Sequence, residues 1–486
     1  MIGRKKETAE LRNLLESNKP ELIAVYGRRR VGKTYLIDET YRNYIVFRHT
    51  GLPPIYDKQS KDNDRDNKLK RQLDAFVQSL AFYNLFTAGD DAPKTWLEAF
   101  GLLSKKIDEK YPDKRIVLFI DELPWMDTPR SYFLEAFTYF WNNYCCFHRN
   151  IVLVVCGSSS SWILDNVIHN HGGLYGRITY SLKLMPFDLG ETEEYLKSIG
   201  VDYSRYDIAN AFMSVGGIPY YLNYFRRGLS LAQNLDQMFF NKGALLEDEF
   251  DELFSSQFTN YQKYKKVVEV LNSKKAGYTA AELASLTGSS LNSVFYNILK
   301  ALEKGGFIQM NNPFGAPGNE RVYRLIDPFC LFYLNNVKTN AGKDKYWETN
   351  IDSQAVVVWR GLAFENICFH HIDKIKEKLG IKWMATEECM WIGKGDDKKR
   401  GAQIDMLIQR KDNVVNLCEA KFYASEVTVD KAMHLDLMNK VERLRPLVSK
   451  KASIINVLIT TYGLKNNEYS YDYPVVVTLD DLFRES

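Results

Sequence analysis

The stretch Gly27-Arg28-Arg29-Arg30-Val31-Gly32-Lys33-Thr34 matches the phosphate-binding pattern G-x-x-x-x-G-K-[ST] at every fixed position. A short apolar run at residues 22–26 precedes it, and a helix-compatible pattern starts at Tyr35. The glycines let the backbone curl so that successive N–H groups face a phosphate, where the helix dipole adds attraction. We therefore expect ATP here, with Lys33 on the β- and γ-phosphates and Thr34 on Mg²⁺. The whole stretch and Tyr35 are the candidate contacts.

The bulk properties of the chain fit a soluble protein of about three domains. It has 486 residues and a net charge of +3, so a nucleic-acid partner is neither required nor excluded. Seven scattered cysteines without a C-x-x-C pair argue against a disulfide framework and a zinc site. The sequence shows no signal-peptide pattern and no apolar run long enough to cross a bilayer. We therefore expect a cytoplasmic protein with no membrane partner.

The alternation of strand-like and helical patterns predicts an α/β protein built from four domains. We place a parallel-sheet nucleotide-binding core at residues 1–190, a helical lid at 191–258, a winged helix-turn-helix at 259–340 and a second α/β domain at 341–486. The predicted core strands are residues 22–26, 44–47, 116–120 and 151–156. The charged run 57–70 is interpreted as a solvated loop.

A second acidic motif follows the apolar strand at residues 116–120. A continuously apolar strand is typical of a buried parallel sheet, and this one delivers Asp121 and Glu122 at its C-terminal end. We expect Asp121 to orient Mg²⁺ and Glu122 to polarise the attacking water.

Two further polar positions are candidates for the same site. Ser158, with Ser159 as the close alternative, follows the strand 151–156 and would lie beside the γ-phosphate, although either serine would also serve as a helix N-cap. Arg177 would supply positive charge to the transition state, in cis or from a neighbouring subunit, unless it is simply a solvated or structural arginine.

Together these motifs resemble the archaeal-type ATPases, which belong to the STAND branch of the AAA+ class. The resemblance implies that Ile2, Gly3 and Arg4 lie by the base and that Pro219 of the lid packs near the adenine. It spans about residues 1–335, and Arg28 to Arg30 are common in the family's loop. The matching segments are Ile2-Gly3-Arg4 with Glu7, the glycine-rich loop, Asp121-Glu122-Leu123-Pro124-Trp125, Gly157-Ser158-Ser159, Leu174-Tyr175-Gly176-Arg177 and Gly216-Gly217-Ile218-Pro219.

The predicted winged helix begins with a capping box, Thr279 and Glu282. Its second helix, residues 290–304, would enter the major groove in a DNA reader. The probable outer face of this helix is polar but poor in Arg and Lys, which supply most nucleic-acid affinity. In the resembling ATPases such modules also act as rigid connectors, so both interpretations stay open.

The C-terminal module carries acidic and basic residues in a recognisable order. Glu365 falls in a predicted helix, Asp405 in a predicted strand, and Glu419-x-Lys421 in the next predicted strand. Asp405 and Glu419 would hold one or two Mg²⁺ or Mn²⁺ ions, and Glu365 would complete the metal shell. Alternation puts Glu419 and Lys421 on one strand face, where Lys421 would polarise water or stabilise the transition state. The basic segment 394–400 would touch phosphates or form a solvated loop.

This order of residues resembles the PD-(D/E)XK nuclease superfamily, and more narrowly a domain that commonly follows archaeal-type ATPases. We therefore expect an ATPase whose motor gates a metal-dependent nuclease on DNA or RNA. The alternative is a signalling ATPase whose last domain binds a partner protein or nucleic acid without catalysis, and oligomerisation is compatible with either function. A DNA-binding regulator acting through the winged helix is a third hypothesis.

Overall fold

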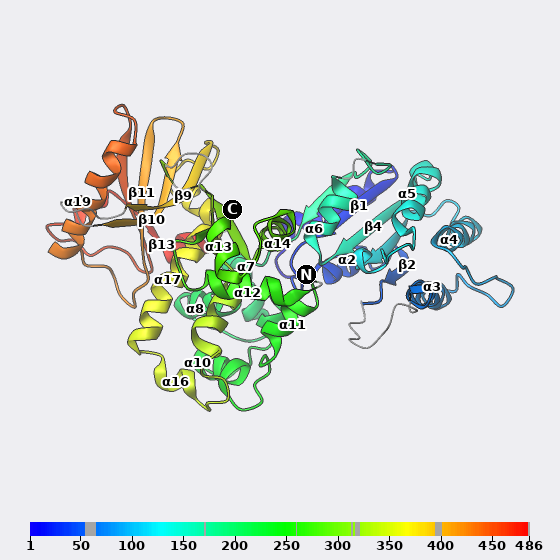
Figure 1. The fold of residues 1–486 in the computed structure, drawn as a ribbon, viewed down its shortest axis with the longest axis horizontal. Helices are drawn as coiled ribbons and strands as arrows, with labels where there is room; N and C mark the ends of the chain where they lie inside the picture. Colours follow the sequence, from blue (N-terminus) through cyan, green and yellow to red (C-terminus); the bar gives the residue numbers. More distant parts are fainter. Residues whose placement is uncertain are drawn as a thin grey trace. The chain divides into compact units, whose positions relative to one another are not determined.

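The computed structural model describes residues 1–53, 65–169, 172–258, 260–312, 314–315, 321–393 and 401–484. The chain divides into two compact units, Met1–Met185 and Pro186–Ser486. Figure 1 shows the elements of each unit. No helix among the described residues has the length and apolar character needed to cross a membrane.

The first unit is built on a five-stranded parallel sheet (Figure 1). Its strand order, β2-β3-β4-β1-β5, places β4 between the two strands that carry the sequence motifs. Strands β3 and β4 are buried along their whole length, as expected for a sheet covered on both faces. The strands are β1 (Glu21–Tyr26), β2 (Ile45–Thr50), β3 (Ile116–Asp121), β4 (Ile151–Gly157) and β5 (Tyr180–Lys183). The predicted parallel α/β sheet is thus confirmed, whereas β5 was not predicted.

Six α-helices accompany this sheet in the described residues of the first unit. They are α1 (Lys5–Glu16), α2 (Lys33–Tyr41), α3 (Arg65–Phe82), α4 (Trp96–Lys110), α5 (Phe133–Asn143) and α6 (Ser160–Ile163), with a π-helical turn at Leu164–Ile168 and short 3-10 turns at Leu123–Trp125 and Cys145–Phe147.

The loop predicted at residues 57–70 is wrong from Arg65 onward, where α3 begins. Residues 57–64 lie outside the described part of the chain. The segment is helical because Leu73, Phe76 and Leu80 recur at helical spacing and bury one face of α3. The charged residues before them masked this pattern.

The second unit begins with a helical segment, and three of its helices are N-capped by the side chains of Asp188, Ser204 and Ser230. One helix of this segment is short and ends at Leu222. Asn234 explains this, because its side chain accepts from the Arg226 N–H and donates to the Arg226 carbonyl, which satisfies a non-helical backbone. The helices are α7 (Leu189–Ser198), α8 (Arg205–Val215), α9 (Pro219–Leu222), α10 (Leu231–Leu235) with a π-helical turn at Asp236–Phe240, and α11 (Glu249–Ser255).

Three helices and a small antiparallel sheet follow. The predicted capping box is present, since Thr279 accepts from the Glu282 N–H and Glu282 accepts from the Thr279 N–H. The last helix starts at Ser293 rather than at residue 290, because the Asn292 side chain caps it. The elements are α12 (Tyr261–Leu271), β6 (Tyr278–Thr279), α13 (Ala280–Thr287), α14 (Ser293–Lys304), β7 (Ile308–Asn311) and β8 (Val322–Leu325), with sheet order β6-β8-β7.

The C-terminal module contains a mixed five-stranded sheet of order β13-β12-β11-β10-β9 (Figure 1). The strands β9, β10 and β11 are antiparallel, whereas β12 and β13 run parallel to β11. The elements are α15 (Pro328–Phe332) with a π-helical turn at Tyr333–Val337, α16 (Tyr346–Asn350), α17 (Gln354–His370), α18 (Ile372–Lys378), β9 (Thr386–Gly393), β10 (Ala402–Arg410), β11 (Val414–Lys421), α19 (Lys431–Leu444), β12 (Ser453–Thr460), β13 (Val475–Thr478) and α20 (Leu479–Phe483), with 3-10 turns at Arg445–Leu447 and Ser470–Asp472.

Within the second unit, the first helices pack on the C-terminal module. The Leu189 N–H at the start of α7 donates to His371 Nε2 at 3.0 Å. Tyr206 of α8 stacks on Phe422, with ring centroids 4.8 Å apart and planes 13° from parallel. Buried polar and aromatic contacts of this kind fix the relative placement of these two segments.

Candidate functional site

The glycine-rich loop has a backbone that only glycine adopts without strain at two positions. Gly27 has φ 146°, and a Cβ there would lie 2.3 Å from the Leu184 carbonyl oxygen. Gly32 has φ 90° and forms the N-cap of α2. The loop is therefore fixed between β1 and α2 in the tight curl that presents backbone N–H groups to a phosphate.

Lys33 closes this loop on itself. Its buried ammonium donates to the carbonyl oxygens of Gly27 and Arg28, each at 3.0 Å. A bound phosphate would offer the same ammonium a charged acceptor, which makes a stronger hydrogen bond than a carbonyl.

Thr34 and Asp121 meet at the end of β3. The Thr34 hydroxyl donates to Asp121 Oδ2 at 2.7 Å, so hydroxyl and carboxylate oxygens lie side by side. Mg²⁺ prefers such oxygen ligands and usually keeps several waters, so the pair fits the expected ion. Arg48 on β2 adds a positive charge, with Nη2 3.9 Å from Asp121 Oδ2. Sequence reasoning missed Arg48, because only the sheet order places β2 beside β3.

Glu122 adopts a left-handed backbone conformation, with φ 48°. Its Oε2 accepts hydrogen bonds from the backbone N–H of Ser158 at 3.0 Å and from the Ser158 hydroxyl at 2.9 Å. Ser159 forms the N-cap of α6 without a side-chain capping bond. The structure thus brings Ser158, rather than its alternative, to the expected catalytic carboxylate.

The other residues predicted to contact the nucleotide lie in several different places. Arg4 is buried, and its guanidinium donates to the Val31 carbonyl at 3.3 Å, which connects the N-terminus to the loop. Arg177 is exposed, while Tyr35 is a large exposed side chain on α2. Pro219 starts α9 and belongs to the second unit.

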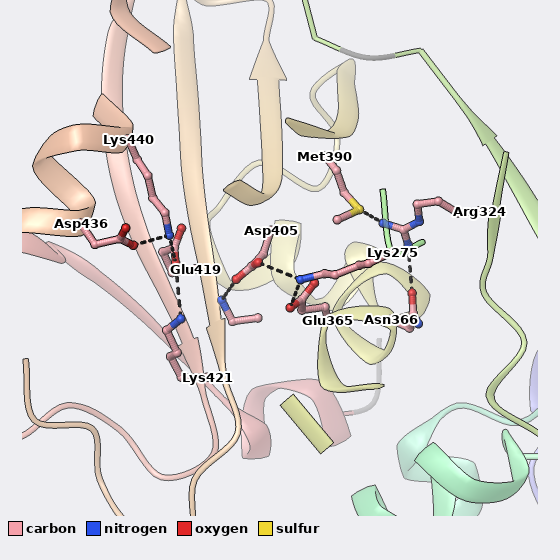
Figure 2. A network of polar contacts seen from close by, with 11 residues as sticks. Lys275, Arg324, Glu365, Asn366, Met390, Asp405, Glu419, Lys421, Asp436 and Lys440 are labelled. Atoms are coloured by element: carbon pink, nitrogen blue, oxygen red, sulfur yellow. Dashed lines mark hydrogen bonds and ion pairs between the residues drawn. The ribbon is translucent and has the colours of Figure 1, made fainter. Parts of the chain in front are cut away.

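A second cluster of candidate residues lies in the C-terminal module (Figure 2). Glu365 projects from α17, Asp405 from β10, and Glu419 and Lys421 from β11. Asp405 Oδ2 accepts the Ala420 N–H at 3.1 Å, and Lys421 Nζ lies 3.6 Å from Glu419 Oε2. The structure brings all four residues into one network.

Asp405 owes its position to an irregularity in the sheet. The register between β10 and β9 shifts between Ile404 and Leu407, so Asp405 lies at this irregularity of its strand. Such β-bulges redirect side chains and are frequent beside active sites.

The carboxylates are buried and repel one another. Glu365 and Asp405 are each 8% exposed, and Glu419 is 2% exposed. Burial, followed by the charge of Asp405, raises the pKa of Glu365 to about 7. The same two causes raise the pKa of Glu419. A site of this kind binds cations, because a positive charge relieves both penalties.

Two of these carboxylate oxygens make no hydrogen bond within the described part of the chain. Glu365 Oε2 and Glu419 Oε1 are buried and lack a hydrogen-bond partner among the described residues. Oxygen ligands of this type suit Mg²⁺ or Mn²⁺. In the present side-chain arrangement, however, no group of three or more His, Cys, Asp or Glu residues in the described part of the chain could hold a metal ion. The donor chemistry fits a divalent cation, whereas the positions of the side chains do not.

Two lysines that sequence reasoning missed explain why the carboxylates suit a divalent cation in chemistry but not in position. Both lysines contact these carboxylates. Lys275 bridges Glu365 and Asp405, and Lys440 of α19 lies 2.7 Å from Glu419 Oε2 (Figure 2). Lys440 also pairs with Asp436, at 2.8 Å. The sequence signal for Lys440 was the unassigned helical pattern at residues 431–444, while Lys275 gave no signal. The basic segment 394–400 lies outside the described residues.

The N-terminal part of the chain matches a known protein family. The model of a family described as an ATPase domain predominantly from Archaea matches residues 1–225. Residues 1–225 thus match an archaeal-type ATPase domain. This domain supports ATP binding and ATPase activity, in agreement with the glycine-rich loop and the Asp121-Glu122 motif.

Relatives of known sequence extend beyond this domain. An uncharacterized protein of Methanocaldococcus jannaschii is 23% identical over 421 residues, which cover 83% of this chain and 87% of the relative. An uncharacterized ATP-binding protein of the same organism is 27% identical over 259 residues, covering 46% of this chain and 69% of the relative. Among solved structures, the Walker-type ATPase of Pyrococcus abyssi is 18% identical, with a TM-score of 0.46, covering 69% of this chain and 96% of the other.

Proposed function

We propose that this ATPase is a regulatory protein whose nucleotide cycle gates a metal-dependent nuclease in its C-terminal module, with DNA or RNA as substrate. The observation that carries the proposal is the convergence of Glu365, Asp405, Glu419 and Lys421 from one helix and two adjacent strands. The buried, unsatisfied carboxylate oxygens of this cluster support a cation site.

Each residue has a chemical role in phosphodiester hydrolysis. Water attacks phosphorus, the bond to the leaving oxygen breaks, and the leaving oxygen takes up a proton. Asp405 and Glu419 would hold Mg²⁺ or Mn²⁺, with Glu365 completing the shell; such an ion would supply an activated water and offset developing charge. Lys421, 29% exposed at its side chain, faces the cluster and would stabilise the charge that builds on the phosphoryl oxygens.

The proposed coupling between ATP and the nuclease rests on the extent of the family match, which crosses the boundary between the two compact units. The matched segment ends at residue 225, so residues 186–225 belong both to the ATPase domain and to the second unit. Within that unit, Leu189 and Tyr206 contact His371 and Phe422 of the C-terminal module. A nucleotide-dependent movement of the lid would therefore be transmitted directly to the elements that carry the carboxylates.

The helices α12 to α14 and the β7–β8 hairpin support a winged-helix module between lid and effector. We favour a connector role, because α14 carries only Lys300 and Lys304 as basic residues. Lys275 of this module contacts the C-terminal cluster, which also fits a connector.

The deciding experiment is cleavage of a panel of single- and double-stranded DNA and RNA with Mg²⁺ or Mn²⁺, with and without ATP. Wild type is compared with Asp405→Ala and Lys421→Ala. The matched control is Asp412→Ala, which removes an aspartate in the β10–β11 turn that pairs with Arg410. We expect ATP-sensitive cleavage in wild type and Asp412→Ala, and loss of at least about 100-fold in the two site variants.

Cleavage that persists in both site variants would contradict the proposal. No cleavage in any chain, with ATP hydrolysis intact, would assign the C-terminal module to binding a partner protein or a nucleic acid.

A further inference from the structure

Lys275 reaches the C-terminal carboxylates from outside the module that carries them. It lies in residues 272–277, which connect α12 to β6. Its Nζ is 2.5 Å from Glu365 Oε1 and 3.6 Å from Asp405 Oδ1 (Figure 2). One ammonium therefore sits between a carboxylate of α17 and a carboxylate of β10.

This ammonium occupies the position between the two carboxylates. A positive charge within ion-pair distance of both offsets their mutual repulsion. A divalent cation bound by Glu365 and Asp405 would need the same oxygens that Lys275 contacts. Lysine and metal are thus alternatives at this position, because two cations cannot share it.

We propose that Lys275 is an intramolecular counter-ion that blocks divalent-metal binding between Glu365 and Asp405 until the segment 272–277 withdraws. The inference rests on the proposed function, since it assigns a regulatory state to the same site. It predicts that the chain in the present arrangement binds metal weakly and that the winged-helix segment controls when the site loads.

The two lysines of the cluster differ in how easily they can leave. Lys440 is 7% exposed and lies within α19, so it cannot withdraw without moving the helix. Lys275 is 31% exposed at its side chain and lies in a turn. A side chain in a short connecting turn has more conformational freedom than one inside a packed helix.

The structure also provides space for this withdrawal. A cavity of about 470 Å³ is lined by Lys275 and Glu365, together with Lys274, Arg324 and Asn366. Arg324 is buried, and its Nη2 donates to Asn366 Oδ1 at 2.9 Å, so it remains on the cavity wall. An anionic group entering this cavity would attract the Lys275 ammonium away from the carboxylates.

The test measures Mn²⁺ binding to the full chain without nucleotide, from the loss of the free-ion electron paramagnetic resonance signal. Asp405→Asn defines the part of the binding that belongs to this site. We expect Lys275→Met to bind Mn²⁺ at the Asp405-dependent site at least about tenfold more tightly than wild type. Lys275→Arg keeps the charge and should stay close to wild type. The control Lys274→Met removes a neighbouring lysine that pairs with Glu282, and should leave the affinity unchanged.

Thermal unfolding of each variant checks that the fold is retained. Equal Asp405-dependent affinity in wild type and Lys275→Met overturns the counter-ion while leaving the metal site intact. If no chain shows Asp405-dependent Mn²⁺ binding, both this inference and the proposed metal-dependent nuclease fail.

Discussion

Ser158 directs both its backbone N–H and its hydroxyl at one carboxylate oxygen of Glu122, at 3.0 and 2.9 Å. This pair joins the end of β4 to the end of β3. We expect Glu122 to polarise the attacking water, which requires a fixed orientation of its carboxylate, and the Ser158 hydroxyl contributes to fixing it.

We therefore predict that Ser158→Ala lowers the kcat of ATP hydrolysis about tenfold and leaves ATP affinity unchanged, because one charge-assisted hydrogen bond is lost. Ser159→Ala, one residue further along, should keep the wild-type rate. Steady-state hydrolysis and equilibrium titration with a fluorescent ATP analogue measure the two quantities separately. Equal loss in both variants would refute the distinct role of Ser158.

The hydrogen bond between Thr34 and Asp121 predicts a magnesium phenotype. Thr34→Ala removes one of the two oxygens that would face the ion, so the Mg²⁺ concentration for half-maximal ATPase activity should rise about tenfold. Thr34→Ser restores a hydroxyl and should restore the wild-type requirement. A threonine with only a structural role in α2 would instead give lower stability at an unchanged Mg²⁺ requirement.

The nucleotide motifs could be predicted from sequence because their determinants are local. The loop needs Gly27 and Gly32 for its backbone, and the buried strand before Asp121 is continuously apolar. Arg48 could not be predicted, since its approach to Asp121 depends on the pairing of β2 with β3. Long-range pairing leaves no trace in the local pattern of a strand.

A buried histidine predicts acid sensitivity of the second unit. Burial lowers the pKa of His371 from 6.5 to about 4, and its Nε2 must remain unprotonated to accept the Leu189 N–H. Its contribution to stability is present in full above pH 6.5 and is lost as pH falls toward 4. We expect the free energy of unfolding to drop by about 2 kcal/mol between pH 7.5 and pH 5 through this residue.

Urea denaturation at the two pH values measures this drop. His371→Gln should reduce the pH dependence, whereas His370→Gln, an exposed neighbour, should keep it. A pH dependence equal in all three chains would show that other groups cause the acid sensitivity.

The stacking of Tyr206 on Phe422 predicts an energetic coupling between the lid and the C-terminal module. Phe422→Ala should destabilise the second unit by about 3 kcal/mol, because a buried ring is removed. A double-mutant cycle with Tyr206→Ala should give a coupling of about 1 kcal/mol. Tyr423→Ala, at an exposed neighbour, is the control and should cost little. Additive effects would mean that the two rings do not act together.

In the C-terminal module, the two strands of the carboxylate pattern could be predicted, whereas most of their surroundings could not. The pattern of strand Asp405 and strand Glu419-x-Lys421 indicated the two strands that are β10 and β11. Tertiary packing sets the parallel pairing of β12 with β11 and the position of α19, which lies between them in sequence. The same packing places Lys440 of α19 beside Glu419. The Lys275 contact required a turn from another part of the chain and had no local signature.

The packing of residues 186–225 against the C-terminal module also constrains how such proteins diversify. A gene fusion that exchanged the effector alone would strip the lid of the surfaces around His371 and Phe422, and would leave apolar area exposed to water. Exchange is least disruptive when the cut falls before Pro186, so that lid and effector are inherited together. We therefore expect a chimera joined at that boundary to keep the contacts of the lid with His371 and Phe422.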